Sequence, residues 1–431
     1  MEKFIINGGT RLSGEVEISG NKNAAAAILS AVSLFDEPCR IENLSQIGDL
    51  DVFIQIYEWL GGKVCRIDEK TIDFDPTNIR NIDIPHRYTK LMRASYYFVG
   101  TLLGRFGRAK VYMPGGCDFG SRPIDQHIKG FEALGATVNV EHGYIEAVAG
   151  NGRLMGNSVY FDNITVGGTI NVLLAAVKAD GLTVIENAAK EPHVVDVANF
   201  LNSAGADIRG AGTDVIKVRG VPYLHSTTYG IIPDQIEAGT FMAAAVATGG
   251  DILIKNIIPK HLESISAKLS EMGADIMDED DWMRVRCSGR PQRVNIRTQP
   301  HPGFPTDMQP QAGVLCAIAN GTSIINEGVT DNRFRYTDEL LRMGAAVKVD
   351  GKTAVFEGVQ SLTGAQVRAT DLRGGVALVL AGMVAHGTTE IEDISYIDRG
   401  YEHLEDKLTR LGADIRRVKF SKPGEDLKKA Q

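Results

Sequence analysis

A glycine-rich segment, PGGCDFGSRPIDQH from Pro114 to His127, carries a cysteine five residues before an arginine. Glycines at this density do not pack as a core strand, so we expect Cys117 to lie on a surface loop. A cation such as Arg122 lowers the pKa of a nearby thiol from its free value of about 8.5. We therefore interpret Cys117 as an acid or a nucleophile, while His127 fits a structural imidazole as well as a catalytic one.

An aspartate and three basic residues stand at the starts of long apolar segments. In HPGFPTDMQPQ, which begins at His301, three prolines restrict the backbone and hold Asp307 in place, as suits a general base for a hydroxyl. A cation at a helix start, as expected for Lys22, Arg93 and Arg373, opposes the helix dipole and needs a compensating reason, which weakens a purely structural interpretation. The aspartates at such starts fit equally well as helix caps: Asp234, Asp307 and Asp371.

A third polar segment, IDRGYEHLEDKL from Ile397, follows the last apolar segment. We expect Arg399 to enter the final amphipathic helix here, where a guanidinium can bind phosphate or carboxylate through paired hydrogen bonds. Together with Lys22 and Arg93, this arginine predicts a basic pocket for small anions in a chain whose net charge is −8.

Six repeats organise these residues. The motif apolar-Gly-small-x-apolar, as in LGGKV from Leu60, recurs at intervals of about 70 residues and should end a helix and begin a strand. Its first glycine suits the left-handed residue that ends a helix. The glycines are Gly61, Gly135, Gly205, Gly273, Gly344 and Gly412.

Each repeat also contains a segment that is apolar nearly all round. A helix without a polar face must be buried on every side. These segments are residues 24–35, 94–103, 170–177, 241–247, 312–319 and 375–385. The chain is therefore predicted to form two pseudo-symmetric α/β domains of three repeats each, with helices inside and sheets outside and a boundary near residues 227–233.

Composition restricts the possible partners. At 431 residues the chain is too long for one ordinary core, so we expect two domains of roughly 200 residues. The acidic net charge argues against binding nucleic acid or a membrane surface, and no apolar run approaches the roughly 20 residues of a membrane helix. No secretory signal is visible, so we expect a cytoplasmic protein, and no obligate protein partner is evident.

The five cysteines are scattered and show no metal-ligand spacing, which predicts reduced thiols and no metal site. We interpret Cys65 and Cys316 as small, buried hydrophobic residues, in contrast to Cys117.

Six motifs that follow one another across nearly the whole chain are specific together, although none suffices alone. They are SGNKNAA from Ser19, GGCDFGSRPIDQH from Gly115, ENAAKEPHVVDVANFL from Glu186, PHPGFPTDMQ from Pro300, TDLRGG from Thr370 and IDRGYEHLEDKL from Ile397. In these motifs the chain resembles the UDP-N-acetylglucosamine 1-carboxyvinyltransferases, a branch of the enolpyruvyl transferase family. The resemblance implies two inside-out α/β barrel domains, residues 22–232 and residues 1–21 with 233–431, that close when the UDP-sugar binds.

The resemblance also implies an activity. The enolpyruvyl group of phosphoenolpyruvate would pass to the 3-hydroxyl of UDP-N-acetylglucosamine with release of phosphate and without a cofactor, as the first committed step of peptidoglycan synthesis. Cys117 matches the proton donor to the enol methylene, which can also carry a covalent adduct, and Asp307 matches the base.

The resemblance assigns the remaining residues to substrates. Those that match phosphoenolpyruvate contacts are Lys22, Asn23, Arg122 and Arg399, of which Lys22 and Arg399 also count as catalytic. Those that match UDP-sugar contacts are Arg93, Arg122, Pro123, Ile124, Asp125, Gln126, Thr165, Val166, Asp307 and Val329. Asp371 and Arg373 match supporting positions, whereas Asn163 and Gln235 depart from the lysine and arginine found in one branch of the family.

Two alternatives remain open. Enolpyruvylshikimate phosphate synthase uses the same donor and a similar fold, but it lacks a cysteine loop such as that around Cys117. A non-catalytic UDP-sugar-binding paralogue would need no acid or base, so Cys117 and Asp307 argue against it.

Overall fold

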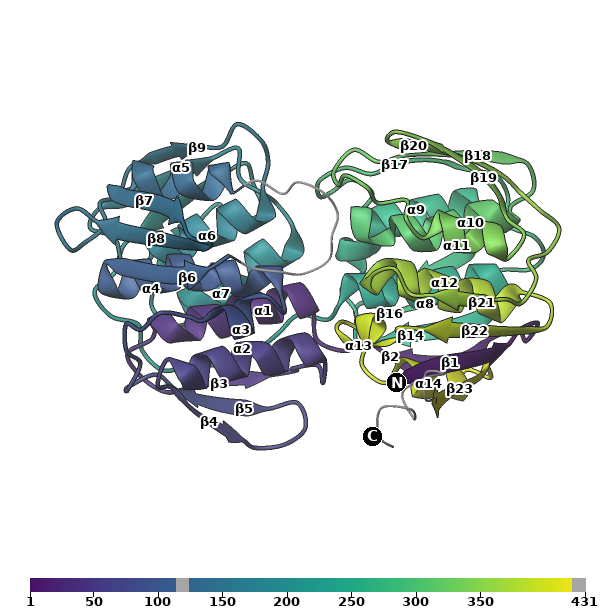
Figure 1. The fold of residues 1–431 in the computed structure, drawn as a ribbon, viewed down its shortest axis with the longest axis horizontal. Coiled ribbons are helices and arrows are strands. Elements are labelled where there is room, and N and C mark those ends of the chain that lie inside the picture. The colour runs from purple at the N-terminus through teal and green to yellow at the C-terminus, as the bar shows by residue number, and fades with distance from the viewer. Residues whose placement is uncertain (114–123, 421–431) are drawn as a thin grey trace, which may run out of the picture. The chain divides into compact units, whose positions relative to one another are not determined.

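The computed structural model describes residues 1–113 and 124–420, and their fold is a mixed α/β fold. The chain forms two compact units. The N-terminal unit is Gly20–Pro233, and the C-terminal unit combines Met1–Ser19 with the chain from Asp234 onward (Figure 1). The first strands of the chain therefore complete sheets whose other strands come from the second half.

Three helices in each unit are buried along most of their length. Their alanine, leucine and valine side chains leave no polar face, so each helix is surrounded by other elements. In the N-terminal unit these are α1 (Lys22–Ala31), α4 (Tyr97–Phe106) and α6 (Val166–Ala176). In the C-terminal unit they are α8 (Gln235–Thr248), α10 (Gln309–Ile318) and α12 (Leu372–Val384). The prediction of six buried apolar helices is confirmed.

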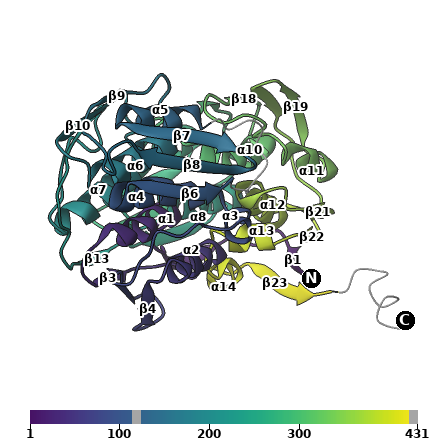
Figure 2. The ribbon, with the colours of Figure 1, turned by 60° about the vertical axis from the view of Figure 1, so that its left-hand side comes forward.

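The described part of the N-terminal unit contains three sheets, and in most of their strands buried residues alternate with more exposed ones. One sheet has the order β13-β3-β5-β4, formed by Thr228–Gly230, Cys39–Glu42, Ile72–Asp75 and Lys63–Arg66. Another, β6-β8-β7, is formed by Arg108–Tyr112, Tyr144–Ala149 and Ala136–Glu141, and it lies in front of α4 and α6 in Figure 2. The third, β11-β12-β10-β9, is formed by Asp207–Arg209, Val215–Arg219, Leu182–Glu186 and Ser158–Tyr160.

The C-terminal unit also contains three sheets in its described part. The sheet β21-β22-β1-β23 is formed by Gln366–Arg368, Thr388–Glu392, Glu2–Asn7 and Asp414–Lys419. The sheet β15-β16-β14-β2 is formed by Asp275–Asp278, Trp282–Arg286, Asp251–Lys255 and Ser13–Glu17. The sheet β17-β18-β20-β19 is formed by Asn295–Arg297, Thr322–Asn326, Thr353–Glu357 and Ala346–Asp350.

A second helix of each repeat precedes the glycine motif. Four such helices are α2 (Gly48–Trp59), α5 (Asp125–Ala133), α7 (Pro192–Ser203) and α9 (Glu263–Glu271), followed by the shorter α11 (Thr337–Arg342) and α14 (Leu404–Arg410). All six motif glycines have positive φ, between 85° at Gly135 and 103° at Gly61, as the helix-ending role requires. Throughout the described residues, every helix is too short or too polar to cross a membrane.

One cysteine prediction is wrong. Cys316 is fully buried in α10, as expected, but Cys65 is exposed. It lies on β4, the edge strand of its sheet, and β4 buries little of its surface. An apolar neighbour such as Val64 therefore does not indicate a buried strand.

Candidate functional site

The carboxylate of Asp307 is held by two buried arginines. The residue lies on a short 3-10 helix, Thr306–Met308, that leads directly into α10. Its Oδ1 accepts a hydrogen bond from Arg333 Nη2 at 2.8 Å, and its Oδ2 accepts from Arg373 Nε and Nη2 at 3.2 and 3.1 Å. The arginine side chains are 3% and 4% exposed, whereas that of Asp307 is 32% exposed. The exposed side of the carboxylate can therefore contact a ligand, while the two buried guanidinium groups fix its orientation.

Arg373 stands at the start of α12, where Asp371 forms the N-cap. The Asp371 Oδ1 atom accepts hydrogen bonds from the backbone N–H groups of Arg373 and Gly374 at 2.9 and 3.0 Å. Burial acts against the charge of Arg373, but Asp307, Tyr401 and Asp234 together outweigh it, so the pKa of the guanidinium is raised. The supporting positions predicted for Asp371 and Arg373 thus lie together, with Asp371 holding the helix start and Arg373 binding Asp307.

Arg399 does not enter the final amphipathic helix, so this expectation is wrong. It follows the short helix α13 (Ser395–Asp398), and α14 begins only at Leu404. The chain between the two helices turns through His403, whose φ of 45° is left-handed and cannot continue an α-helix. Arg399 is half-buried in this turn.

A buried ionic cluster fastens the same turn to the start of α8. Lys407 Nζ lies 2.7 Å from Glu237 Oε1 and donates to Ser19 Oγ at 2.7 Å. The Ser19 hydroxyl in turn contacts Glu402 Oε2 at 2.5 Å. Burial raises the pKa of Glu237, and the charge of Lys407 opposes that rise. The cluster therefore depends on a charge pair that has little access to water.

In the N-terminal unit, Lys22 begins α1 and pairs with an acid. Its Nζ atom lies 2.8 Å from Asp49 Oδ2, and the two side chains are 15% and 10% exposed. Asn21, the N-cap, accepts a hydrogen bond from the N–H of Ala24, while Asn23 is half-buried in the first turn. The sequence prediction missed Asp49, whose place in the first turn of α2 resembles an ordinary first-turn acid.

Arg93 begins the short helix before α4 and lies over the ring of Tyr96, 5.7 Å from its centroid. Burial lowers the pKa of this guanidinium. The ring of Tyr96 also contacts His127, with 5.8 Å between centroids. A cation in this position would be stabilised by an anionic ligand.

His127 is a buried, neutral imidazole. Asn171 Oδ1 accepts from the Gly100 N–H, so its Nδ2 group is the donor to Tyr96 O at 2.8 Å and to His127 Nδ1 at 3.0 Å. This bond places the ring proton on Nε2. Burial, together with the charge of Arg93, lowers the pKa of His127 to about 4. The structural role that the sequence left open for His127 is thus supported by its geometry.

The residues around the start of α5 form a polar cluster. Gln126 Nε2 donates to Asp125 Oδ2 at 2.7 Å, and Gln126 Oε1 accepts from the Asp162 N–H at 2.9 Å. Ile124 immediately precedes the helix. Thr165 caps α6 by accepting from the Gly168 N–H at 3.2 Å, and Val166 is the first residue of that helix.

Three predicted site residues, Cys117, Arg122 and Pro123, lie outside the described residues. Val329 is 45% exposed in the C-terminal unit, where its backbone N–H donates to Glu327 Oε1 at 2.9 Å. Arg333 was missed by the sequence prediction because its segment, DNRFRYTDEL, contains two arginines and no local feature that distinguishes one from the other. Among the described residues, no group of three or more His, Cys, Asp or Glu side chains is placed to hold a metal ion.

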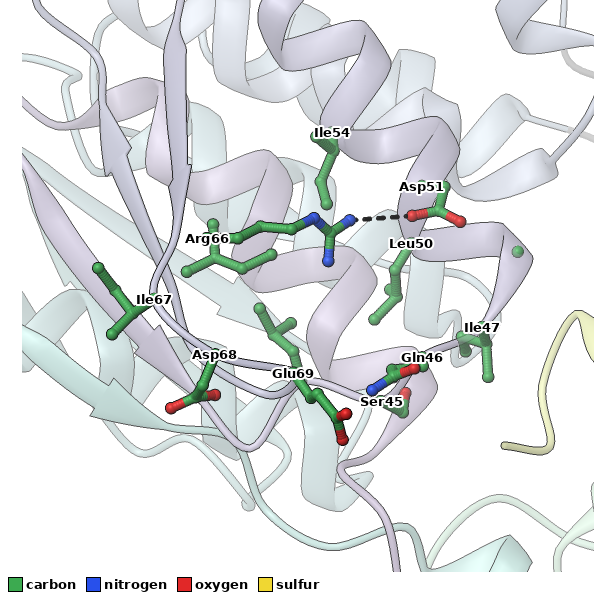
Figure 3. Close-up of a pocket in the computed structure, with 13 residues that line it drawn as sticks. Ser45, Gln46, Ile47, Leu50, Asp51, Ile54, Arg66, Ile67, Asp68 and Glu69 are labelled. Carbon is green, nitrogen blue, oxygen red and sulfur yellow. Dashed lines mark hydrogen bonds and ion pairs between the residues drawn. The ribbon is translucent and has the colours of Figure 1, made fainter. Parts of the chain in front are cut away.

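A separate pocket of about 640 Å³ lies beside α2 in the N-terminal unit (Figure 3). Its apolar floor includes Leu50 and Ile54, and Arg66 Nη2 donates across it to Asp51 Oδ1 at 3.2 Å. The residues that line it include none of the described site residues predicted above.

Comparisons with known proteins place the chain among several relatives. The family described as EPSP synthase (3-phosphoshikimate 1-carboxyvinyltransferase) matches residues 6–408. The chain is 56% identical to UDP-N-acetylglucosamine 1-carboxyvinyltransferase 3 of Caldanaerobacter subterraneus subsp. tengcongensis, over 97% of this chain and 100% of that one. It is 49% identical to UDP-N-acetylglucosamine 1-carboxyvinyltransferase of Klebsiella pneumoniae over the same shares.

Solved structures are similar along the whole chain. The enolpyruvyl transferase NikO from Streptomyces tendae has a TM-score of 0.87 at 26% identity and covers 97% of this chain and 99% of its own. EPSP synthase from Acinetobacter baumannii has a TM-score of 0.76 at 16% identity, over 97% and 100% of the two chains, which shows a shared fold.

Proposed function

This chain belongs to the enolpyruvyl transferase family, and we propose that it transfers the enolpyruvyl group of phosphoenolpyruvate to the 3-hydroxyl of UDP-N-acetylglucosamine. The full-length similarity to UDP-N-acetylglucosamine 1-carboxyvinyltransferases carries this conclusion. The alternative acceptor, shikimate 3-phosphate, is supported less, because the similarity to a solved EPSP synthase extends only to the fold. The reaction is an early step in building peptidoglycan.

The proposed chemistry is an addition followed by an elimination. Cys117 protonates C3 of phosphoenolpyruvate while Asp307 accepts the proton of the sugar 3-hydroxyl, whose oxygen forms a bond to C2. The tetrahedral intermediate then loses a proton from its methyl group, and the bond from C2 to the phosphate oxygen breaks. The double bond is restored and phosphate leaves. No step requires a metal or a cofactor.

The exposed face of Asp307 supports its part in this scheme. A carboxylate that two guanidinium groups bind on one side presents its remaining lone pairs in one direction. We assign the donor substrate to Lys22, Arg122 and Arg399, with Asn23 beside them. The charges of the lysine and the two arginines stabilise carboxylate and phosphate throughout the reaction. The UDP-sugar is assigned to Arg93, to residues 122–126, to Thr165 and Val166, and to Asp307 and Val329.

The finer architecture follows the same proposal. Each unit would be an inside-out α/β barrel, with its three buried helices at the centre and its sheets around them. The boundaries would make residues 22–232 the domain of Cys117, and residues 1–21 with 233–431 the domain of Asp307 and Arg399. We place the reaction in the cytoplasm, the compartment of its small-molecule substrates.

Phosphate release tests the function directly. The purified protein is mixed with phosphoenolpyruvate and either UDP-N-acetylglucosamine or shikimate 3-phosphate, and we expect phosphate with the UDP-sugar alone. Cys117→Ser should reduce the rate by roughly 10²–10⁴-fold, the usual worth of a general acid. Cys65→Ser removes an exposed thiol elsewhere and should leave the rate unchanged. Release with shikimate 3-phosphate, or binding of the UDP-sugar without any turnover, would refute the proposal.

A further inference from the structure

One buried cation contacts both the base and the turn that carries Arg399. Arg373 donates to Asp307 through Nε and Nη2, and its Cζ lies 5.4 Å from the centroid of the Tyr401 ring. Tyr401 is 3% exposed and follows Arg399 by two residues. Through the guanidinium of Arg373, the Tyr401 ring therefore connects the turn of Arg399, which is assigned to phosphoenolpyruvate, with Asp307, which is assigned to the UDP-sugar.

The hydroxyl of Tyr401 is anchored to two of the buried central helices. Thr240 on α8 donates its hydroxyl proton to Ile236 O at 2.7 Å, so its oxygen acts as the acceptor for the Tyr401 hydroxyl at 2.8 Å. Gln311 on α10 donates Nε2 to the Thr240 and Tyr401 hydroxyl oxygens at 3.1 and 3.3 Å. These hydrogen bonds join α8 and α10 to the Arg399 turn and favour one arrangement of the side chains. Two buried atoms of the network, Gln311 Oε1 and Arg373 Nη1, have no hydrogen-bond partner among the described residues.

The charges around this network are consistent with a fixed support. Burial raises the pKa of Tyr401, so its hydroxyl stays neutral and keeps the proton that it donates to Thr240. The Arg373 guanidinium is attracted to the face of the ring, and such contacts strengthen when water is excluded. Thr240 and Gln311 carry no charge, and besides Asp307 the nearby Asp234 also raises the pKa of Arg373.

We propose that Tyr401 is a positioning residue, which sets the Arg399 turn and the Asp307 carboxylate in register through Arg373. The inference rests on the proposed enolpyruvyl transfer, in which the sugar oxygen must approach C2 of the donor. Reacting atoms held about 3–3.5 Å apart gain most of their advantage from alignment, and small displacements are costly. If the Tyr401 side chain lost the hydrogen bonds that hold it, the reaction would therefore slow, with little effect on the binding of either substrate.

Three variants test this role by steady-state kinetics with both substrates. Tyr401→Phe keeps the ring over Arg373 and removes only the hydroxyl, and Thr240→Val removes the acceptor of that hydroxyl. We expect each variant to lower kcat about tenfold, the rate equivalent of one buried hydrogen bond, while both KM values stay within about twofold of the wild-type values. The double variant should also lose about tenfold, because both changes break the same link.

Tyr336→Phe is the matched control. Tyr336 is also fully buried in the C-terminal unit, but its hydroxyl has no hydrogen-bond partner among the described residues. Its removal should leave kcat and the melting temperature unchanged. Calorimetry of each variant shows whether the chain remains folded during the assay.

Several results would overturn the inference. They are an unchanged kcat in both single variants, a loss confined to KM, an equal loss in Tyr336→Phe, or losses that multiply in the double variant. Wild-type protein that releases no phosphate from phosphoenolpyruvate and UDP-N-acetylglucosamine would instead refute the proposed function, so the two failures are distinguishable.

Discussion

Asp307→Asn removes one negative charge from between two buried guanidinium groups while keeping the size of the side chain. Breaking a fully buried ion pair costs about 3–5 kcal/mol, because the remaining charge is left uncompensated. Here Arg333 and Arg373 are 3% and 4% exposed, but Asp307 itself is 32% exposed and asparagine still offers one acceptor oxygen. We therefore expect the free energy of unfolding to fall by about 2 kcal/mol, below the full cost of a broken buried pair.

Activity should respond far more strongly than stability. The asparagine amide cannot accept the proton of the sugar hydroxyl, so turnover should fall by roughly 10²–10⁴-fold. At about 2–4 °C per kcal/mol for a domain of this size, the melting temperature of the C-terminal unit should fall by about 4–8 °C, as measured by calorimetry. Titration calorimetry should show that the UDP-sugar still binds.

Asp251→Asn provides a matched control within the same unit. Asp251 is 38% exposed and also contacts two arginines, Arg284 at 2.7 Å and Arg286 at 3.1 Å, but these are 42% and 45% exposed. Surface pairs contribute about 0–1 kcal/mol, so this variant should lose little stability and no activity. Near-normal turnover of Asp307→Asn would refute its role as the base. Equal destabilisation by the two variants would refute the argument from the burial of the arginines.

Two further perturbations address the N-terminal unit. Lys22→Ala removes the cation 2.8 Å from Asp49 and should raise the KM for phosphoenolpyruvate at least about tenfold in steady-state assays. Lys178→Ala, which breaks a half-buried Lys–Asp pair in the same unit, should leave this KM unchanged, and equal effects would contradict the assignment. Burial raises the pKa of Asp196 to about 6, so this residue stabilises the fold below pH about 4 and that contribution disappears as the pH rises through about 6. The free energy of unfolding measured in urea should therefore fall by about 3 kcal/mol between pH 4 and 7 in the wild type, relative to Asp196→Asn. Parallel curves of unfolding free energy against pH for the two proteins would exclude this linkage.

Local features of the site were predictable where they depend on neighbours in the chain. Asp371 was recognised as a possible helix cap, and it does cap α12, because capping involves only the first turn of a helix. The length of the last helix was predicted wrongly, since the left-handed backbone at His403 separates Arg399 from α14. Cys65 was predicted to be buried because a cysteine outside a reactive segment is usually a small buried residue, and only the order of strands shows that β4 lies at an edge.

The amino-acid sequence by itself determined the repeat, the six buried helices and the residues that begin them, because periodicity, glycine and proline act over a few neighbouring residues. Only the tertiary structure decided which of those residues meet. Arg333 reaches Asp307 across 26 positions, Arg373 across 66, and Tyr401 reaches Thr240 across 161. No local pattern encodes such contacts, since they arise from the packing of separate helices around one core. The orientation of the proposed base therefore depends on long-range packing, although its identity could be predicted from a short motif.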